Sequence, residues 1–119
     1  LVWRHPVIRP SNLVLLRNDE TPPSTELVFA SGNDLVYVSP ESGKVIRVLK
    51  FGKIISRLYA ENSDLYVVSN DVYRIQAGDR NPSIVIDPPN PVYKLTFASG
   101  MTLALDDLYS IYGYAPVQD

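Results

Sequence analysis

The fold class is decided by one stretch of the chain, Asp34-Leu35-Val36-Tyr37-Val38-Ser39-Pro40-Glu41-Ser42-Gly43-Lys44-Val45-Ile46-Arg47. Two short runs rich in β-branched and aromatic residues flank a cluster of proline, glycine and polar residues. Such runs favour β-strands, and such a cluster favours the turn between them. The stretch therefore predicts a β-hairpin made of strands at 35–39 and 45–50.

Short strands and polar turns continue in both directions from this hairpin. Ten prolines are spread over the 119 residues, and they interrupt any long helix. The apolar residues alternate with a period of two rather than 3.6. We therefore predict a single all-β domain spanning 1–119. The expected strands are 13–17, 26–30, 35–39, 45–50, 54–60, 65–69, 72–76, 83–87, 92–98, 102–106 and 108–114, and 2–8 is an optional twelfth.

An internal repeat runs through these strands. An aromatic residue followed by alanine recurs three times, and a leucine follows six residues after each aromatic residue. The aromatic-alanine pairs are Phe29-Ala30, Tyr59-Ala60 and Phe97-Ala98, and the leucines are Leu35, Leu65 and Leu103. The repeat predicts successive antiparallel meanders at approximately 26–53, 54–90 and 91–115. The N-terminal segment 1–25 is then an added strand or arm.

The stretch from Asp34 to Arg47 resembles the blade repeat of quinoprotein-like and YVTN-type β-propellers. In those repeats a strand, a polar turn ending in Ser/Thr-Gly-Lys and a second strand follow in that order, and residues 65–75 are similar with a shorter turn. The resemblance implies a partial β-propeller of about three blades. The tryptophan that often follows the third strand in quinoprotein repeats is missing, because Arg47-Val48 stand there. The resemblance therefore supports the blade architecture but no quinone, and we expect no cofactor.

Three blades cannot close a ring, because a propeller needs about four to eight blades. Three interpretations stay open at this point. The chain is a fragment of a larger propeller, or several copies or a partner chain complete one ring, or the strands instead wrap into a β-sandwich or barrel. The first two interpretations leave open sheet edges that favour association with another chain.

The residues that carry catalysis or bind metal are few. The chain contains no cysteine and a single histidine, His5, which lies between Arg4 and Pro6. The densest carboxylate pair, Asp106-Asp107, consists of adjacent residues whose side chains point apart, and turn chemistry explains it better than a cation site. We therefore predict no catalytic residue, no metal site and no enzymatic activity.

Charge and hydropathy limit the class of partner. Eleven basic and thirteen acidic residues give a net charge of −2, and the basic residues are scattered, so nucleic acid is not an expected partner. The longest apolar runs are far too short for a transmembrane segment, so we expect no membrane span. A protein partner, either another copy of the chain or a different chain, is the remaining expectation, with a homo-oligomer or a larger assembly as the result.

A cluster of tyrosines near the C-terminal end is the candidate contact for such a partner. Tyrosine is enriched at protein interfaces, although it also suits half-buried sheets. The candidate residues are Tyr109, Tyr112 and Tyr114. The sequence thus favours a non-enzymatic, propeller-like interaction or structural module completed by self-association or a partner chain. The alternative is a fragment of a larger propeller enzyme or ligand-binding protein whose site lies outside this chain.

Overall fold

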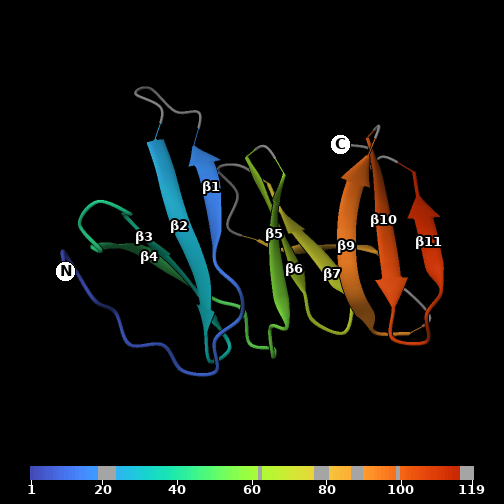
Figure 1. The fold of residues 1–119 in the computed structure, drawn as a ribbon, viewed down its shortest axis with the longest axis horizontal. Helices are drawn as coiled ribbons and strands as arrows, with labels where there is room; N and C mark the ends of the chain where they lie inside the picture. Colours follow the sequence, from blue (N-terminus) through green and yellow to red (C-terminus); the bar gives the residue numbers. More distant parts are fainter. Residues whose placement is uncertain (19–23, 62, 77–80, 87–89, 99, 116–119) are drawn as a thin grey trace.

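A computed structural model describes residues 1–18, 24–61, 63–76, 81–86, 90–98 and 100–115, and these form strands and connections without a helix (Figure 1). The strands group into three antiparallel sheets that follow one another along the chain. The first sheet has the order β1 (Val14–Asn18), β2 (Ser24–Ser31), β3 (Asp34–Val38) and β4 (Val45–Lys50). The second has β5 (Arg57–Glu61), β6 (Asp64–Val68), β7 (Val72–Ile75) and β8 (Ser83–Ile86). The third has β9 (Val92–Ala98), β10 (Met101–Asp106) and β11 (Ile111–Tyr114).

The predicted all-β class is confirmed, and three of the expected strands differ clearly from the structure. The strand expected at 54–60 begins only at Arg57. Residues 2–8 form no strand, although the side chains of Trp3 and His5 pack against the first sheet. The strand expected at 108–114 begins only at Ile111, because Tyr109 adopts a left-handed backbone conformation with a φ of 65°. A residue with this φ belongs to a turn and cannot continue a strand.

The aromatic-alanine repeat is kept in two hairpins and shifted in the third. Ala30 pairs with Leu35 in the first sheet, and Ala60 pairs with Leu65 in the second. In the third sheet the chain turns earlier, so Leu103 pairs with Thr96 instead of Ala98. Gly100, with a φ of 77°, permits this tight turn directly before Met101. The sequence repeat therefore does not correspond to one repeated register.

The three sheets stack face to face around two apolar layers. One cluster joins the first and second sheets, and it includes Val28 and Leu35 on one side and Leu58 and Leu65 on the other. A second cluster joins the second and third sheets. Its buried members are Tyr66, Val68, Val72, Ile86, Val92, Leu95 and Ala104. None of the three sheets closes on itself within the described residues, so these strands do not form a barrel.

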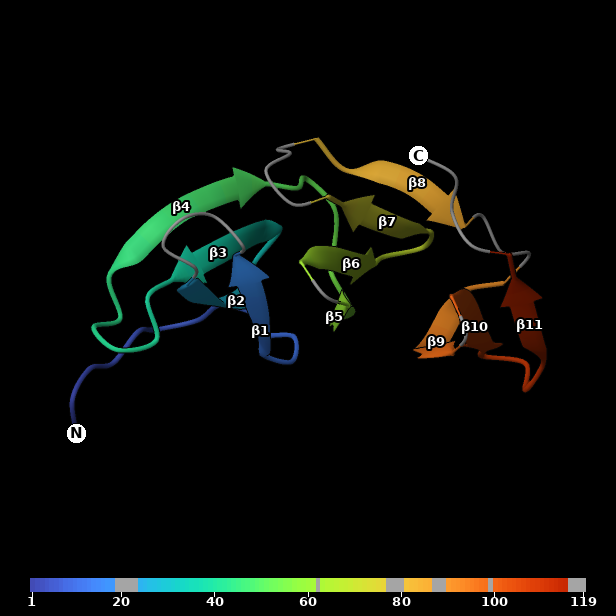
Figure 2. The ribbon, with the colours of Figure 1, turned by 90° about the horizontal axis from the view of Figure 1, so that it is seen from above.

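The sheets spread like a fan when the molecule is seen from above (Figure 2). The first strands of the sheets, β1, β5 and β9, lie along one side of the fan, where β1 contacts β5 and β5 contacts β9. The last strands of the first two sheets, β4 and β8, lie on the opposite side. The two outermost faces of the fan, one on the first sheet and one on the third, are the surfaces that the fold leaves without a neighbouring sheet. Among the described residues there is also no helix long and apolar enough to cross a membrane.

Candidate functional site

The described residues gather no cluster of three or more side chains from the His, Cys, Asp and Glu set that could hold a metal ion. His5 lies on the first sheet, where its ring meets the ring of Phe29 edge to face with 5.3 Å between the centroids. Its Nδ1 lies 2.8 Å from the carbonyl oxygen of Pro6. These contacts place the imidazole in packing with the sheet and bring no acidic partner to it.

Asp106 organises the turn between β10 and β11. Its carboxylate accepts hydrogen bonds from the backbone N–H groups of Ser110 at 2.8 Å and Leu108 at 3.0 Å, and from the side-chain amide of Asn90 at 3.2 Å. The bond from Ser110 is the main cause that lowers the pKa of Asp106 below its ordinary value, and burial opposes it. The side chain is buried, and its acceptor capacity is used within the turn, as the turn interpretation of this residue expects.

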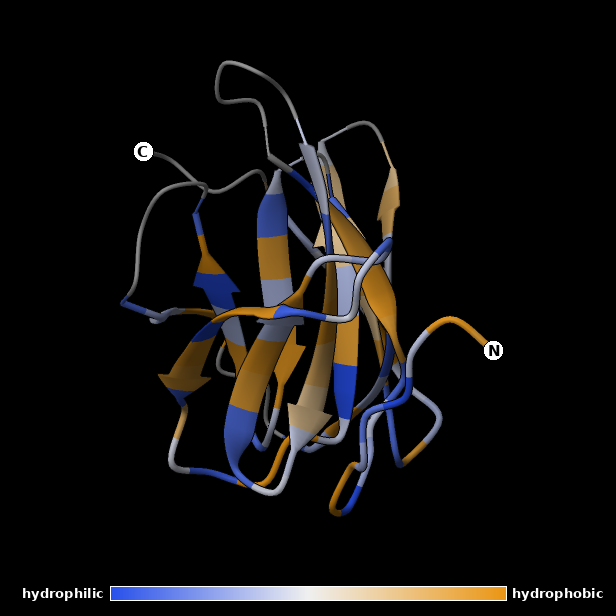
Figure 3. Ribbon diagram, turned by 90° about the vertical axis from the view of Figure 1, so that its left-hand side faces the viewer, coloured by the Kyte–Doolittle hydropathy of each residue, from blue (hydrophilic) through white to orange (hydrophobic). Residues whose placement is uncertain are grey.

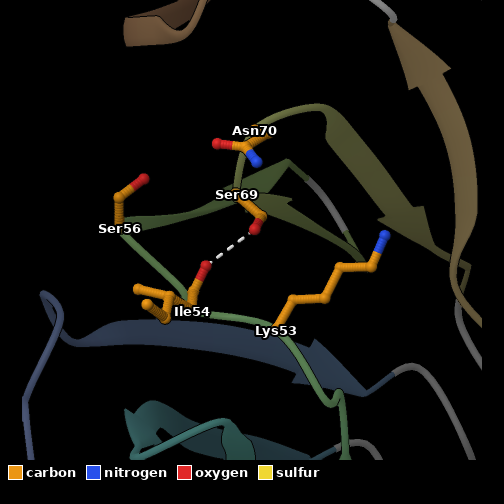
Figure 4. Close-up of a pocket in the computed structure, with 5 residues that line it drawn as sticks. All are labelled: Lys53, Ile54, Ser56, Ser69 and Asn70. Carbon is orange, nitrogen blue, oxygen red and sulfur yellow. Dashed lines mark hydrogen bonds between the residues drawn. The ribbon is translucent and has the colours of Figure 1, made fainter.

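A hollow of about 480 Å³ opens between the connection from the first to the second sheet and the β6–β7 turn (Figure 4). Lys53, Ile54, Ser56, Ser69 and Asn70 line it. The Ser69 hydroxyl donates to the Ile54 carbonyl at 2.7 Å, and the Ser56 hydroxyl donates to the Val68 carbonyl at 3.0 Å. Lys53 donates to the Tyr73 hydroxyl at 2.7 Å, and this bond raises the pKa of Lys53. The main donors of the hollow are thus committed to the chain itself, so it offers little to a ligand.

The second sheet shows what a sheet of this protein with a neighbouring sheet on each face looks like in its central strands, β6 and β7. In β6 the side chains of Leu65 and Val67 are buried against the first sheet, and those of Tyr66 and Val68 are buried against the third. All four residues of β7 are buried as well. Both faces of the second sheet therefore carry apolar side chains because each face has a neighbour.

Among the described residues, the third sheet has a neighbouring sheet on one face only. In β10, Thr102, Ala104 and Asp106 are buried, whereas the alternate residues Met101, Leu103 and Leu105 are exposed or half-buried. Ile111 pairs with Leu105, so it shares this side, and it is 76% exposed. We call these four residues, Met101, Leu103, Leu105 and Ile111, the third-sheet outer face. Lys94 and Thr96 of β9 pair with Leu105 and Leu103, so the exposed apolar side chains are bordered by polar ones on the same side. Exposed apolar side chains gathered on one side of a sheet mark a candidate interaction surface.

The first sheet has a partly covered outer face. Phe29, Val36 and Val38 are buried there under Trp3, which belongs to the N-terminal arm, residues 1–12. The same side of the sheet carries Leu15, Ile46 and Val48, and these remain about half exposed. Figure 3 views the molecule from this side and shows hydrophobic bands along the strands. We call Leu15, Phe29, Val36, Val38, Ile46 and Val48 the first-sheet outer face.

Trp3 fixes the arm to the β3–β4 turn. Its indole Nε1 donates to the Pro40 carbonyl oxygen at 2.8 Å, and its ring lies directly against Gly43. Gly43 has a φ of 72°, which favours glycine, and a Cβ atom there would overlap the indole. No local sequence pattern predicts this role of Trp3, because the contact joins residues far apart in the chain.

The tyrosine cluster is divided by the structure. Tyr112 and Tyr114 lie on β11, with 6.5 Å between their ring centroids, and they pair with Ala104 and Thr102 on the side that faces the second sheet. Tyr109 lies in the preceding turn and is 91% exposed. Tyr112 and Tyr114 are half-buried, so Tyr109 is the most exposed of the three. The sequence alternation from Met101 to Leu105 separates the two sides of β10, but it does not indicate that this side is the exposed one.

Comparison with protein-family models, with curated proteins and with solved structures finds no match to this chain. A function must therefore be argued from the geometry of the sheets. The feature that this geometry singles out is the contrast between a second sheet with two covered faces and two end sheets with uncovered apolar side chains.

Proposed function

We propose that the protein is a non-enzymatic interaction or structural module, built like part of a β-propeller, whose end sheets are completed by another β-sheet. A second copy of the chain or a partner chain supplies that sheet. The observation that carries the proposal is the exposed apolar surface at both ends of a stack whose middle sheet is covered on both faces. The function is then association itself, with no reaction at its centre.

The energetics favour coverage of these faces. Full burial of one large aliphatic side chain contributes about 1.5–3 kcal/mol relative to leaving it in water. Ile111, Leu103 and Leu105 on one end and Ile46 and Val48 on the other all retain exposed surface. Part of this gain offsets the cost of bringing two chains together, which is several kcal/mol. A face of this size therefore suits a partner that covers most of it at once, as a second sheet does.

The arrangement of the strands supports a propeller-like geometry for the assembly. Three meanders follow each other in sequence, and their first strands lie next to one another. In propellers the blades are likewise short antiparallel sheets arranged around a central channel. A fan of such sheets continues naturally by adding further sheets at its two ends. The resemblance of residues 34–47 to a blade repeat agrees with this geometry.

The solution mass tests the proposal. We expect light scattering to give a mass above the 13.3 kDa of one chain, rising with concentration, because the end faces become covered by association. Ile111→Lys should lower that mass by placing a charge on the third-sheet outer face. Ile84→Lys is the matched control, since Ile84 is also an exposed isoleucine but lies on the second sheet. A monodisperse monomer at every concentration contradicts completion by a second copy, so a partner chain would then have to supply the sheet.

A further inference from the structure

The first eight residues of the N-terminal arm are attached to the first sheet mainly at two points. At one point, Trp3 lies over the buried centre of the first-sheet outer face, and its indole N–H donates to the β3–β4 turn. At the other, the N–H of Ile8 donates to the Ser31 hydroxyl at 3.1 Å, and the Ile8 carbonyl oxygen accepts from the Gly32 N–H. Among the described residues, the backbone of residues 2–7 makes no backbone–backbone hydrogen bond. Release of this segment would therefore leave every strand pair of the sheet intact.

The surface that receives Trp3 belongs entirely to the hairpin of β2 and β3 and the turn that follows it. Phe29, Val36 and Val38 form its floor, and the Pro40 carbonyl and Gly43 border it. We call these five residues the tryptophan cradle. None of them lies in the arm, so the cradle offers the same contacts to the tryptophan of another chain. The arm begins at the outer end of the fan, where a second molecule can approach (Figure 2).

A strained connection leads from this segment to the rest of the chain. Arg9 has a φ of 46°, a left-handed conformation that is disfavoured about ten-fold for a residue with a Cβ atom. Pro10 follows, and proline favours an extended conformation in the residue before it. The connection 9–11 lies between two fixed points, since Ile8 is bonded to the first sheet and Asn12 is bonded to the second. It is therefore bent against its preference as long as the arm lies on its own sheet.

From these observations we infer that two copies of the chain exchange the first eight residues of their arms. Trp3 of each copy lies in the tryptophan cradle of the other, and Ile8 of each copy forms its two hydrogen bonds with the other. Every contact of the arm is kept, whereas the connection 9–11 becomes extended and loses its strain. A short connection under strain is the feature that favours such an exchange between identical chains. The inference goes beyond the proposed function, because it uses neither the third-sheet outer face nor the stacking of one sheet on another.

A second copy is the partner that the cradle fits, because the arm demonstrates the fit within one chain. The indole N–H of Trp3 finds an acceptor at 2.8 Å, and the absence of a Cβ at Gly43 leaves room for the indole ring. His5, two residues further on, meets the ring of Phe29. An arm from a second copy carries the same two side chains at the same spacing. It therefore reproduces both contacts on the same surface.

The length of the connection limits how the two copies lie. Four residue steps separate Ile8 from Asn12, and they span at most about 14 Å when extended. The β2–β3 turn of one copy, which holds Ile8 of the other, therefore lies near Asn12 of that other copy. Because the same relation holds in both directions, the two connections run close to a two-fold axis.

The strain also sets the expected strength of the pair. An arm attached through a short connection competes for its own cradle with an effective concentration in the millimolar range. Release of the strain at Arg9 in both copies favours the exchanged pair about 100-fold. We therefore expect a dissociation constant on the order of 10 µM.

Crosslinking between single-cysteine variants tests the exchange. The chain has no cysteine, so each variant carries one reactive position. Arg4 and Glu41 are exposed, and they adjoin Trp3 and Pro40, which are bonded to each other. Arg4→Cys and Glu41→Cys chains that are unfolded together and refolded at about 100 µM should give a mixed crosslink with a short bismaleimide. Its absence overturns the exchange. Ile84→Cys in place of Glu41→Cys is the control and should give no such product, because Ile84 lies on the second sheet.

A glycine in the connection tests the role of the strain. Glycine adopts a positive φ without the penalty of a Cβ atom, so Arg9→Gly stabilises the arm on its own sheet. The variant should weaken the pair about 100-fold in analytical ultracentrifugation, because two connections lose their strain in the single chains. Arg4→Gly is the matched control, since Arg4 is an exposed arginine of the same arm outside the connection, and its dissociation constant should stay unchanged. Equal dissociation constants for the two variants overturn the exchange that we infer.

Ile111→Lys separates this inference from the proposed function. The exchange does not use the third-sheet outer face, so the mixed crosslink should persist in chains that also carry Ile111→Lys. A mixed crosslink that Ile111→Lys abolishes overturns the exchange, because the copies then meet through the third-sheet outer face. Association that Ile111→Lys abolishes without any mixed crosslink also overturns the exchange and leaves the proposed function standing. A two-copy mass that Ile111→Lys leaves unchanged, together with the mixed crosslink, supports the exchange and contradicts the proposed role of the third-sheet outer face.

Discussion

Asn12 and Leu58 are joined in the way that two paired strand residues are. The side-chain Nδ2 of Asn12 donates to the carbonyl oxygen of Leu58 at 2.8 Å, and the backbone N–H of Leu58 donates to Oδ1 of Asn12 at 2.8 Å. Leu58 lies on β5, the edge strand of the second sheet, and is fully buried. One amide side chain thus satisfies both backbone groups of a buried edge residue and ties the arm to the second sheet.

Replacing Asn12 by alanine should destabilise the protein. Asn12→Ala leaves a buried N–H and a buried C=O of Leu58 without these partners, and each unsatisfied group costs about 1–3 kcal/mol. Urea denaturation should show a lower midpoint for the variant. Asn70→Ala is the control, because Asn70 is an exposed asparagine of the β6–β7 turn, and its midpoint should stay close to that of the unsubstituted protein. A midpoint for Asn12→Ala equal to that of the control would show that water replaces the amide without loss.

A related bond joins the second and third sheets. The backbone N–H of Leu95 donates to the Tyr59 hydroxyl at 3.1 Å, and Leu95 holds the same position relative to its hairpin as Leu58 does. Tyr59→Phe keeps the ring and removes this acceptor, so we expect a loss of about 0.5–1.5 kcal/mol in the free energy of unfolding. Tyr93→Phe, at an exposed tyrosine, should leave that free energy unchanged. A larger loss for Tyr93→Phe than for Tyr59→Phe would contradict the role of the Tyr59 hydroxyl.

Two glycines distinguish backbone strain from steric overlap. Gly43 and Gly52 have φ angles of 72° and 81°, so an alanine at either position is strained by about 1–2 kcal/mol. An added Cβ at Gly52 meets no atom within 4 Å, whereas at Gly43 it meets the Trp3 indole. Gly43→Ala should therefore cost more than Gly52→Ala in thermal unfolding. In the Trp3→Ala background that difference should disappear, and a difference that persists would place the cost elsewhere.

The lowered pKa of Asp106 gives a pH dependence of stability. A carboxyl whose pKa is lower in the folded state stabilises the protein above its ordinary pKa of about 3.9, and the contribution is lost as the pH falls through the lowered value. Unfolding followed from pH 6 downward should therefore show a loss of stability below about pH 4 that Asp106→Asn reduces. Asp107→Asn, at the exposed neighbour, is the control and should show the same dependence of stability on pH as the unsubstituted protein. If Asp106→Asn loses stability with falling pH as steeply as the unsubstituted protein does, the acid sensitivity comes from other groups.

Local chemistry made the strands predictable. The run 45–50 was placed at the bounds of β4, and the run 35–39 lies within one residue of β3, because β-branched residues and the turn at Ser42-Gly43 act over a few positions. The register of the third hairpin was not predictable, since a turn one step earlier changes every pair while the composition stays the same. The turn conformation of Tyr109 was not predictable for a similar reason. The sequence around Tyr109 favours a strand, but the turn that Asp106 organises determines the backbone conformation there.

The candidate surface was harder to predict than the strands. Which side of β10 meets a neighbour depends on stacking between sheets, and this is a contact between residues far apart in the sequence. Alternation in 101–106 shows that the two sides differ, but both sides contain apolar residues, so it does not say which one is exposed. The tyrosines were predicted as a contact from their residue type alone, but Tyr112 and Tyr114 lie on the side that faces the second sheet.

The double coverage of the second sheet has a consequence for anyone who trims this chain. Removing the third sheet would uncover Tyr66, Val68 and Val72, which are now buried, and removing the first would uncover Leu65 and Val67. A truncated chain would expose an apolar face of the second sheet in place of the outer face that was removed. Charged substitutions on the first-sheet and third-sheet outer faces should therefore increase solubility more than truncation does, because truncation exposes an apolar face that is now buried.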